Sequence, residues 1–239
     1  MSSSQSIWAV VPAAGIGSRM AADIPKQYLP LHNATVIEWT LRKLLAVQRV
    51  RKVVVAVAEH DPHWPQLAIS QHPQIVTTGG GAERADSVLA GLGALQGLAQ
   101  SNDWVLVHDA ARPCVQPASI NRMIDELHDH PVGGILAVPV ADTLKYASPR
   151  EPADIDKTVD RKRTWAAQTP QMFRYGELLN ALQNASGDGF IVTDEASALE
   201  HLGVQPRLVV GRTDNLKITT PDDLALAQLI LASQSNLLE

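Results

Sequence analysis

The sequence predicts an α/β fold in which a doubly wound, mostly parallel sheet is covered by helices and carries a projecting β arm. Two observations lead to this prediction. Short apolar runs alternate with amphipathic segments over the first 138 residues, an order that favours parallel strands joined by helices. The alternation then stops, and residues 139–163 carry three prolines among charged residues and no helical stripe. We therefore expect a single domain over residues 1–239, with an inserted arm at about 139–163.

The expected strands are short and apolar, and the helices between them carry start signals. Thr35 opens a helix with Glu38 three residues later, the pattern of a capping box. Thr220 followed by Pro221 predicts the start of the last helix, and further helices are expected near Tyr175 and Asp194. A helical stripe of Val88, Leu89, Leu92 and Leu95 predicts one more. The runs that predict strands are residues 7–11, 52–58, 74–78 and 104–108.

The composition indicates a globular chain without a dominant surface charge. The 239 residues are 45% hydrophobic and carry a formal net charge of −5, so no broad basic surface for nucleic acid is expected. No apolar run approaches the ~20 residues that span a bilayer, and the first residues lack the basic region of a signal peptide. We therefore expect a cytoplasmic protein with no membrane partner, which holds any anionic ligand through a few local Lys and Arg side chains.

The single cysteine and the histidines indicate no special chemistry. One cysteine, Cys114, excludes an intrachain disulfide, and without a catalytic partner it is interpreted as a small packed residue. The eight histidines form no convincing zinc set.

The stretch VVPAAGIGSRM, residues 10–20, joins a strand, a glycine loop and an arginine. Glycines let backbone amides approach an anion, and arginine adds a permanent positive charge, so the combination suggests a phosphate site. A dinucleotide fingerprint is excluded because its third glycine would fall at Met20, and the G-K-[ST] of a Walker loop is absent. A purely structural turn is the alternative, but Pro25-Lys26 adds a second cation and favours the phosphate site.

Six segments together resemble one family. PAAGIGSRM with PKQY, GGGAERADSV, VHDAARP, TPQ, TDEASA and DNLKIT are similar to 2-C-methyl-D-erythritol 4-phosphate cytidylyltransferases, over nearly the whole chain and in the family's order. The resemblance implies a Rossmann-like nucleotidyltransferase fold whose β arm joins two subunits in a homodimer with shared active sites. It implies transfer of CMP from CTP to methylerythritol phosphate with release of pyrophosphate, in isoprenoid precursor biosynthesis. Mg²⁺, bound mainly through the CTP phosphates, is the implied cofactor.

The resemblance also assigns roles to residues of this sequence. The implied catalytic residues are Arg19, Lys26, Arg161 and Lys217. The implied nucleotide-binding residues are Ala13, Ala14, Gly15, Gly17, Gly81, Ala82, Ser87 and Asp109. The implied substrate-binding residues are Asp109, Arg112, Thr143, Arg161, Thr169 and Thr193, and Asp109 is also the implied metal ligand. Some members carry aspartate where this chain has Ala82, so only a backbone contact to the base is expected there.

Several roles stay open when the residues are taken alone. Asp109 follows a strand, where ligand-facing residues of open α/β sheets lie, and could contact Mg²⁺, ribose or substrate, or tie down its loop through Arg112. For Ser87 a helix-start role is the alternative to base recognition. Lys26 could be a solvated surface lysine, and Lys217 a charge at the end of a strand.

Two other functions compete with the one that the resemblance implies. A cytidylyltransferase for ribitol 5-phosphate or another polyol phosphate would differ mainly in the arm, around Thr143 and Arg161. A non-catalytic nucleotide-binding subunit would have lost one of the key cations, yet Arg19, Lys26 and Lys217 are all present. In the basic run 161–163 we favour a functional role for Arg161 and a solvated role for Arg163.

Overall fold

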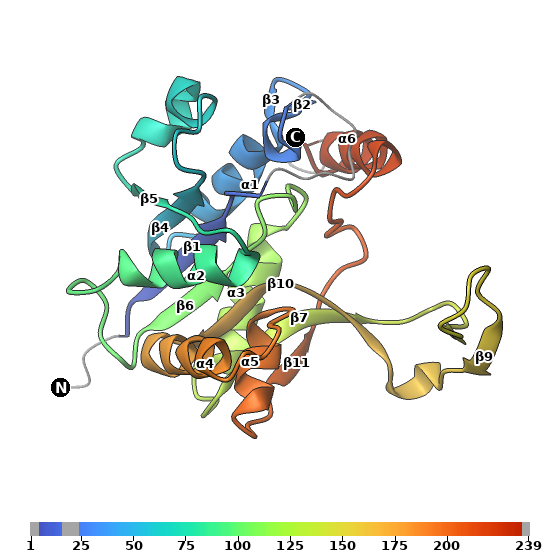
Figure 1. Cartoon of the computed structure of the whole chain (residues 1–239). Coiled ribbons are helices and arrows are strands. Elements are labelled where there is room, and N and C mark those ends of the chain that lie inside the picture. The colour runs from blue at the N-terminus through green and yellow to red at the C-terminus, as the bar shows by residue number, and fades with distance from the viewer. Residues whose placement is uncertain (1–4, 16–23, 236–239) are drawn as a thin grey trace.

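Seven strands form the central sheet of the computed structural model, which describes residues 5–15 and 24–235 (Figure 1). In chain order they are β1 (Ile7–Pro12), β4 (Val50–Val57), β5 (Ile75–Gly79), β6 (Trp104–Val107), β7 (Gly133–Pro139), β10 (Trp165–Arg174) and β11 (Arg207–Val210). Their order across the sheet is β11-β7-β10-β6-β1-β4-β5. β1 pairs in parallel with both β4 and β6, β4 with β5, and β11 with β7. β10 is antiparallel to both of its neighbours. The predicted fold class, a mostly parallel doubly wound sheet, is confirmed.

The helices α1 (Val36–Leu45), α5 (Glu195–His201) and α6 (Pro221–Ser235) begin where the sequence signals place them. Thr35 accepts a hydrogen bond from the Glu38 amide while the Glu38 carboxylate accepts one from the Thr35 amide, so the predicted capping box is present. Asp194 caps its helix in the same way, and the Thr220 hydroxyl accepts from the Asp223 amide. The other helices are α2 (Arg84–Gly93), α3 (Pro117–Leu127) and α4 (Tyr175–Gly187).

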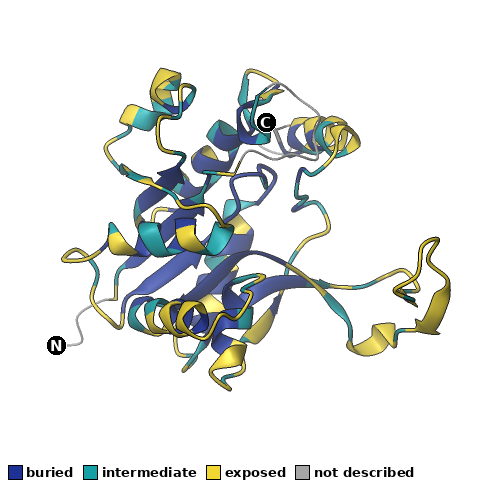
Figure 2. Ribbon diagram, viewed as in Figure 1, coloured by how far each residue is buried: buried dark blue, intermediate teal, exposed yellow. Residues whose placement is uncertain are grey.

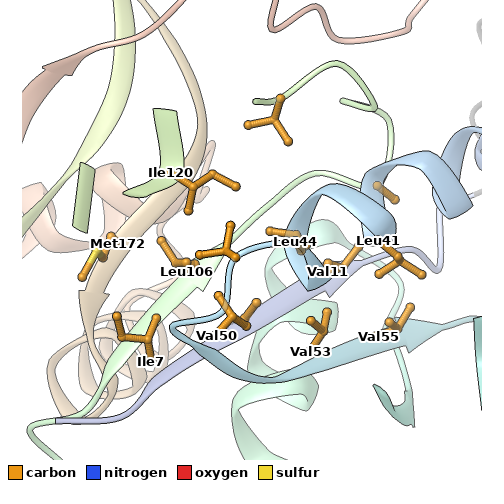
Figure 3. Packing of buried hydrophobic residues seen from close by; sticks show 14 of the residues in the cluster. Ile7, Val11, Leu41, Leu44, Val50, Val53, Val55, Leu106, Ile120 and Met172 are labelled. Carbon is orange, nitrogen blue, oxygen red and sulfur yellow. The ribbon is translucent and has the colours of Figure 1, made fainter. Parts of the chain in front are cut away.

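The two faces of the sheet are covered by different helices because alternate residues of each strand point to opposite sides. On one face Val11, Val53 and Val55 lie opposite Leu41 and Leu44 of α1 (Figure 3), and α3 joins the same cluster. On the other face Trp8, Val10 and Val54 pack with α2, α4 and α5. Buried residues therefore concentrate in the sheet and the inner sides of these helices (Figure 2).

A β arm projects from the sheet between β7 and β10 (Figure 1). Its two strands, β8 (Lys145–Ala147) and β9 (Ile155–Thr158), pair antiparallel and are exposed along their whole length (Figure 2). A short 3₁₀ turn at Arg161–Arg163 leads back into β10. Tyr146 and Ile155 are 59% and 67% exposed, so the arm has no core of its own in the single chain.

Three strands and one helix of the second half were not predicted, namely β7, β10, β11 and α3. The sequence WAAQTPQMFR of β10 places Pro170 inside a central strand, where a missing amide donor argues against strand structure. The chain accommodates it because the pairing with β7 breaks between Ala167 and Gln171. Thr169 lies within this break and therefore does not pair with a residue of β7.

Cys114 is a packed residue, as predicted. It is buried beside Leu31, Val36 and Ala227, and burial raises the pKa of its thiol to about 12. In the described part of the chain no helix combines the length and apolar character needed to cross a membrane.

Candidate active site

Two adjoining cavities open at the carboxyl ends of the parallel strands, where β1 has β4 on one side and β6 on the other. Ligands of open α/β sheets bind at such a switch in strand order. The first, the loop cavity, has a volume of about 170 Å³ and is lined mainly by the segments that follow β1, β5 and β6. The second, the threonine cavity, has a volume of about 200 Å³. The residues that line both cavities are Arg84, Asp109 and Lys217.

One wall of the loop cavity is the start of the predicted glycine loop, Ala13, Ala14 and Gly15. The Ala13 amide donates to Ala56 O at 2.7 Å, so this amide is not free to bind phosphate. The side-chain amide of Gln27 donates to Ala13 O at 2.8 Å and to Gly15 O at 3.0 Å, which fixes the course of the loop. Two other predicted loop residues, Gly17 and Arg19, lie outside the described residues.

The opposite wall is the turn that enters α2, and it includes Gly81 and Ala82. The Ser87 hydroxyl accepts from the Gly81 amide at 3.2 Å and donates to Glu83 O at 3.3 Å, so it holds the turn together from inside. At Gly80 a Cβ atom would lie 2.6 Å from the Cβ of Ala14, so only glycine lets the two walls approach this closely.

Asp109 lies between the cavities and contacts three cations. Its carboxylate is 2.8 Å from Lys217 Nζ, 2.9 Å from Arg84 Nε and 3.6 Å from Arg112 Nε. Burial by itself would raise the pKa of Asp109, but Arg84, Lys217 and Arg112 together hold that pKa well below its usual range. Asp109 is therefore a permanent negative charge around which the cations are arranged.

Arg84 connects Asp109 to a second buried carboxylate. Its two terminal nitrogens donate to Glu195 at 2.6 and 3.0 Å, and the Glu195 side chain is fully buried. Burial alone would lower the pKa of Arg84, but Glu195 and Asp109 raise it above its ordinary value. The α2 and α5 N-termini are thereby joined across the site.

The sequence reasoning missed Arg84, Glu195 and Gln27. All three lie inside quoted segments, GGGAERADSV, TDEASA and PKQY. No spacing rule pairs Arg84 with Glu195, because 111 positions separate them. The available signal for Arg84 was its position beside acidic residues at the start of a helix. An exposed arginine with no function would show the same pattern.

The two predicted lysines meet at the loop cavity through one connecting segment. Lys26, on the 3₁₀ turn Lys26–Tyr28, donates to Ile218 O at 3.0 Å. The Ile218 amide donates to Ala111 O at 2.8 Å, which fixes the segment that carries Lys217 beside the β6 loop. Both lysines line the loop cavity.

The threonine cavity brings together Arg112, Thr169 and Thr193. Arg112 donates to Asn215 O at 2.7 Å, and Asn215 in turn donates to Thr169 O at 2.8 Å. Three of the predicted substrate-binding residues therefore line one cavity together with Asp109.

The other two predicted substrate-binding residues, Thr143 and Arg161, lie on the arm and line neither cavity of this chain. The Arg161 guanidinium donates to Ala141 O within the arm itself. Figure 1 shows the arm extending away from the sheet between β7 and β10. Among the residues that the structure describes, no group of three or more His, Cys, Asp or Glu could hold a metal ion.

Comparisons with known proteins agree with the motifs. A family model described as 2-C-methyl-D-erythritol 4-phosphate cytidylyltransferase matches residues 7–233. A protein of that name from Vibrio vulnificus (strain YJ016) is 52% identical over 231 residues, covering 97% of each chain. One from Ectopseudomonas mendocina (strain ymp) is 55% identical over 225 residues, covering 93% of this chain and 94% of the relative.

Solved structures agree as well. A crystal structure of 4-diphosphocytidyl-2C-methyl-D-erythritol synthase superposes with a TM-score of 0.82 at 40% identity, over 96% of this chain and 100% of the other. The 2-C-methyl-D-erythritol 4-phosphate cytidylyltransferase of Francisella tularensis gives a TM-score of 0.82 at 38% identity, over 94% and 99% of the two chains. The resemblance drawn from the motifs is confirmed.

Replacing Glu195 with glutamine is expected to lower the free energy of unfolding by about 1–3 kcal/mol, because an amide satisfies the buried Arg84 guanidinium only in part. Urea unfolding gives the measurement. The control is Asp125→Asn, which weakens the half-exposed Arg49–Asp125 pair and should cost less than about 1 kcal/mol. Equal losses in the two variants would mean that the Glu195–Arg84 pair contributes no more than a surface pair.

Proposed function

Because the chain belongs to the 2-C-methyl-D-erythritol 4-phosphate cytidylyltransferase family, we propose that its two adjoining cavities bind the two substrates of that reaction on either side of Asp109. The chain is an enzyme that transfers CMP from CTP to 2-C-methyl-D-erythritol 4-phosphate, with release of pyrophosphate, in isoprenoid precursor biosynthesis. The loop cavity takes the nucleotide, and the threonine cavity takes the polyol phosphate.

The observation that supports this division is the cluster of cations shared by the two cavities. Arg84 and Lys217 line both of them and contact Asp109 between them. Two anionic substrates repel each other, and fixed positive charge at their meeting point offsets that repulsion. Of the described residues, Ala13–Gly15 and the Gly81–Ala82 turn line the loop cavity and not the other, as a nucleotide site requires, while Arg112 and the two threonines line only the threonine cavity.

The reaction requires that the two substrates be positioned and that fixed positive charge be present. It does not require a covalent enzyme intermediate. An oxygen of the methylerythritol phosphate forms a bond to the α-phosphorus of CTP, and pyrophosphate leaves with the electron pair of the broken P–O bond. Lys26, Lys217 and, by family resemblance, Arg19 stabilise the charge that develops on the phosphate oxygens. Lys217 pairs with Asp109 in the chain without substrates, so a bound phosphate would compete with Asp109 for this lysine.

Mg²⁺ fits this site as an ion held mainly by the nucleotide. Asp109 is the predicted protein ligand, but both of its oxygens contact cations. Mg²⁺ typically takes one or two carboxylates and completes its shell with water and substrate phosphates. When bound, it would neutralise charge on the triphosphate, with Asp109 as the residue that would hold it.

The arm supports the proposal of a homodimer with shared active sites. Thr143 and Arg161 lie on a segment without a core, whose Tyr146 and Ile155 side chains are exposed. In a two-fold dimer, an arm that reached across would deliver these residues to the partner's threonine cavity. We also propose that the enzyme acts in the cytoplasm, because its substrate CTP is a metabolite of the cell interior.

CTP and methylerythritol phosphate are expected to give CDP-methylerythritol and pyrophosphate, and EDTA is expected to stop the reaction. A coupled assay of pyrophosphate release, run with a panel of polyol phosphates, provides the measurement. Higher kcat/KM with ribitol 5-phosphate would overturn the substrate assignment. Activity that persists in EDTA would show that the reaction does not need a divalent metal.

Shared sites predict complementation between two inactive variants. Lys26→Ala and Arg161→Ala should each lose ~10²–10³ in rate, because each removes a contact made to the reacting phosphates. When the two chains are unfolded and refolded together, random pairing makes about half of the dimers mixed, and each mixed dimer has one intact site, so about a quarter of wild-type activity should return.

The control is Arg163→Ala, which lies on the same 3₁₀ turn as Arg161 and should stay active alone. No recovery, although mixed dimers are demonstrated to be present, would contradict the shared site and place every catalytic residue within one chain.

A further inference from the structure

His108, between the end of β6 and Asp109, is fully buried. Its Nδ1 atom is 3.0 Å from the Thr169 hydroxyl oxygen, and its Nε2 atom is 3.2 Å from Arg112 O. Both ring nitrogens contact neutral groups in a site without solvent access, where an unpaired imidazolium is costly, so the ring is taken as neutral with a single N–H.

The neighbours of the ring decide where that proton lies. The carbonyl oxygen of Arg112 can only accept a hydrogen bond, so Nε2 carries the proton and donates to it. Nδ1 is then an acceptor, and the Thr169 hydroxyl must donate to it. The alternative tautomer would leave two lone pairs facing each other between Nε2 and Arg112 O.

Within residues 5–15 and 24–235, the Thr169 hydroxyl has one further hydrogen-bond partner. The backbone amide of Asp109 donates to its oxygen at 3.0 Å. A hydroxyl has one proton and two acceptor positions, so the proton and one acceptor position are occupied. What remains is a single acceptor position on a residue that lines the threonine cavity.

We propose that His108 is a positioning residue that holds the Thr169 hydroxyl as an acceptor, so that Thr169 recognises a hydroxyl group of the polyol and not its phosphate. A phosphate monoester near neutral pH is mainly the dianion and has no proton to donate. A polyol hydroxyl has one. The inference rests on the proposed assignment of the threonine cavity to the polyol phosphate.

A purely structural role for His108 is a weaker account of these contacts. The backbone of Thr169 is held independently, because the side-chain amide of Asn215 donates to Thr169 O at 2.8 Å. What His108 adds at Thr169 is therefore the direction of the hydroxyl proton.

The first test needs no substrate. In long-range ¹H–¹⁵N NMR spectra of the histidine-labelled full chain near pH 7, the signals lost in His108→Asn identify His108 among the eight histidines. The expected pattern is a neutral ring with Nε2 protonated and Nδ1 bare. A proton on Nδ1, or an imidazolium, would overturn the inference whatever the enzyme's substrate is.

The second test compares two amide variants of the same residue. The Asn oxygen of His108→Asn can replace Nδ1 as the acceptor for Thr169, whereas the amide of His108→Gln lies nearer to Nε2 and can replace only the donor to Arg112. His108→Gln is expected to raise KM for the polyol phosphate by about 2- to 12-fold, the effect of one net hydrogen bond. KM for CTP and kcat should change little, and His108→Asn should have the smaller effect.

Two results of that comparison would contradict the proposal. One is an equal or larger rise in KM for His108→Asn. The other concerns Thr169→Val, which removes the hydroxyl but keeps the branched shape: in this background His108→Gln should have no further effect on KM. An undiminished effect there would mean that His108 acts on the site through packing alone.

Discussion

The buried carboxylate of Asp109 is the constraint on which the site depends. It follows β6 in the chain and is contacted by Lys217, Arg84 and Arg112, each of which comes from a different segment of the chain. Unpaired charges are costly to bury, so each cation needs the carboxylate and the carboxylate needs the cations. Arg84 extends the pairing to Glu195, which joins the start of α2 to the start of α5. The parallel strands bring these segments to the carboxyl ends of the strands, and the ion pairs then fix their positions relative to one another.

This arrangement prepares the site for two anionic substrates. The cations are held before any phosphate arrives, so binding exchanges one negative partner for another and needs little reorganisation. The hydrogen bonds between neutral groups around Asp109 are likewise formed before a substrate binds. Its backbone amide donates to the Thr169 hydroxyl, and that hydroxyl is oriented by His108, so charge recognition and hydroxyl recognition meet at one residue. By contrast, in the part of the chain that the structure describes, the arm strands β8 and β9 pair only with each other.

The sequence predicted the regular half of the fold and the outline of the site. Strand β1, the capped helix α1 and the arm follow from apolar runs, caps and prolines, which are local signals. Strand β10 was missed because Pro170 argues against a central strand, and only the pairing break with β7 makes it possible. The motifs placed Lys26, Asp109 and Lys217 together, but the Arg84–Glu195 pair and the His108–Thr169 contact depend on long-range packing. Ala13 was an implied nucleotide-binding residue, but its amide donates to Ala56 O in the neighbouring strand β4.

The central claim, that Asp109 stays ionised as the anchor of three cations, is tested most directly by a ¹³C NMR titration of its carboxyl carbon in the full chain without substrates. Asp109→Asn identifies the signal. The account predicts no protonation step from about pH 8 down to about pH 3, because Arg84, Lys217 and Arg112 hold the pKa of Asp109 below its usual range. A protonation step at or above about pH 4, the ordinary range for aspartate, would show that burial outweighs the cations and would contradict the account.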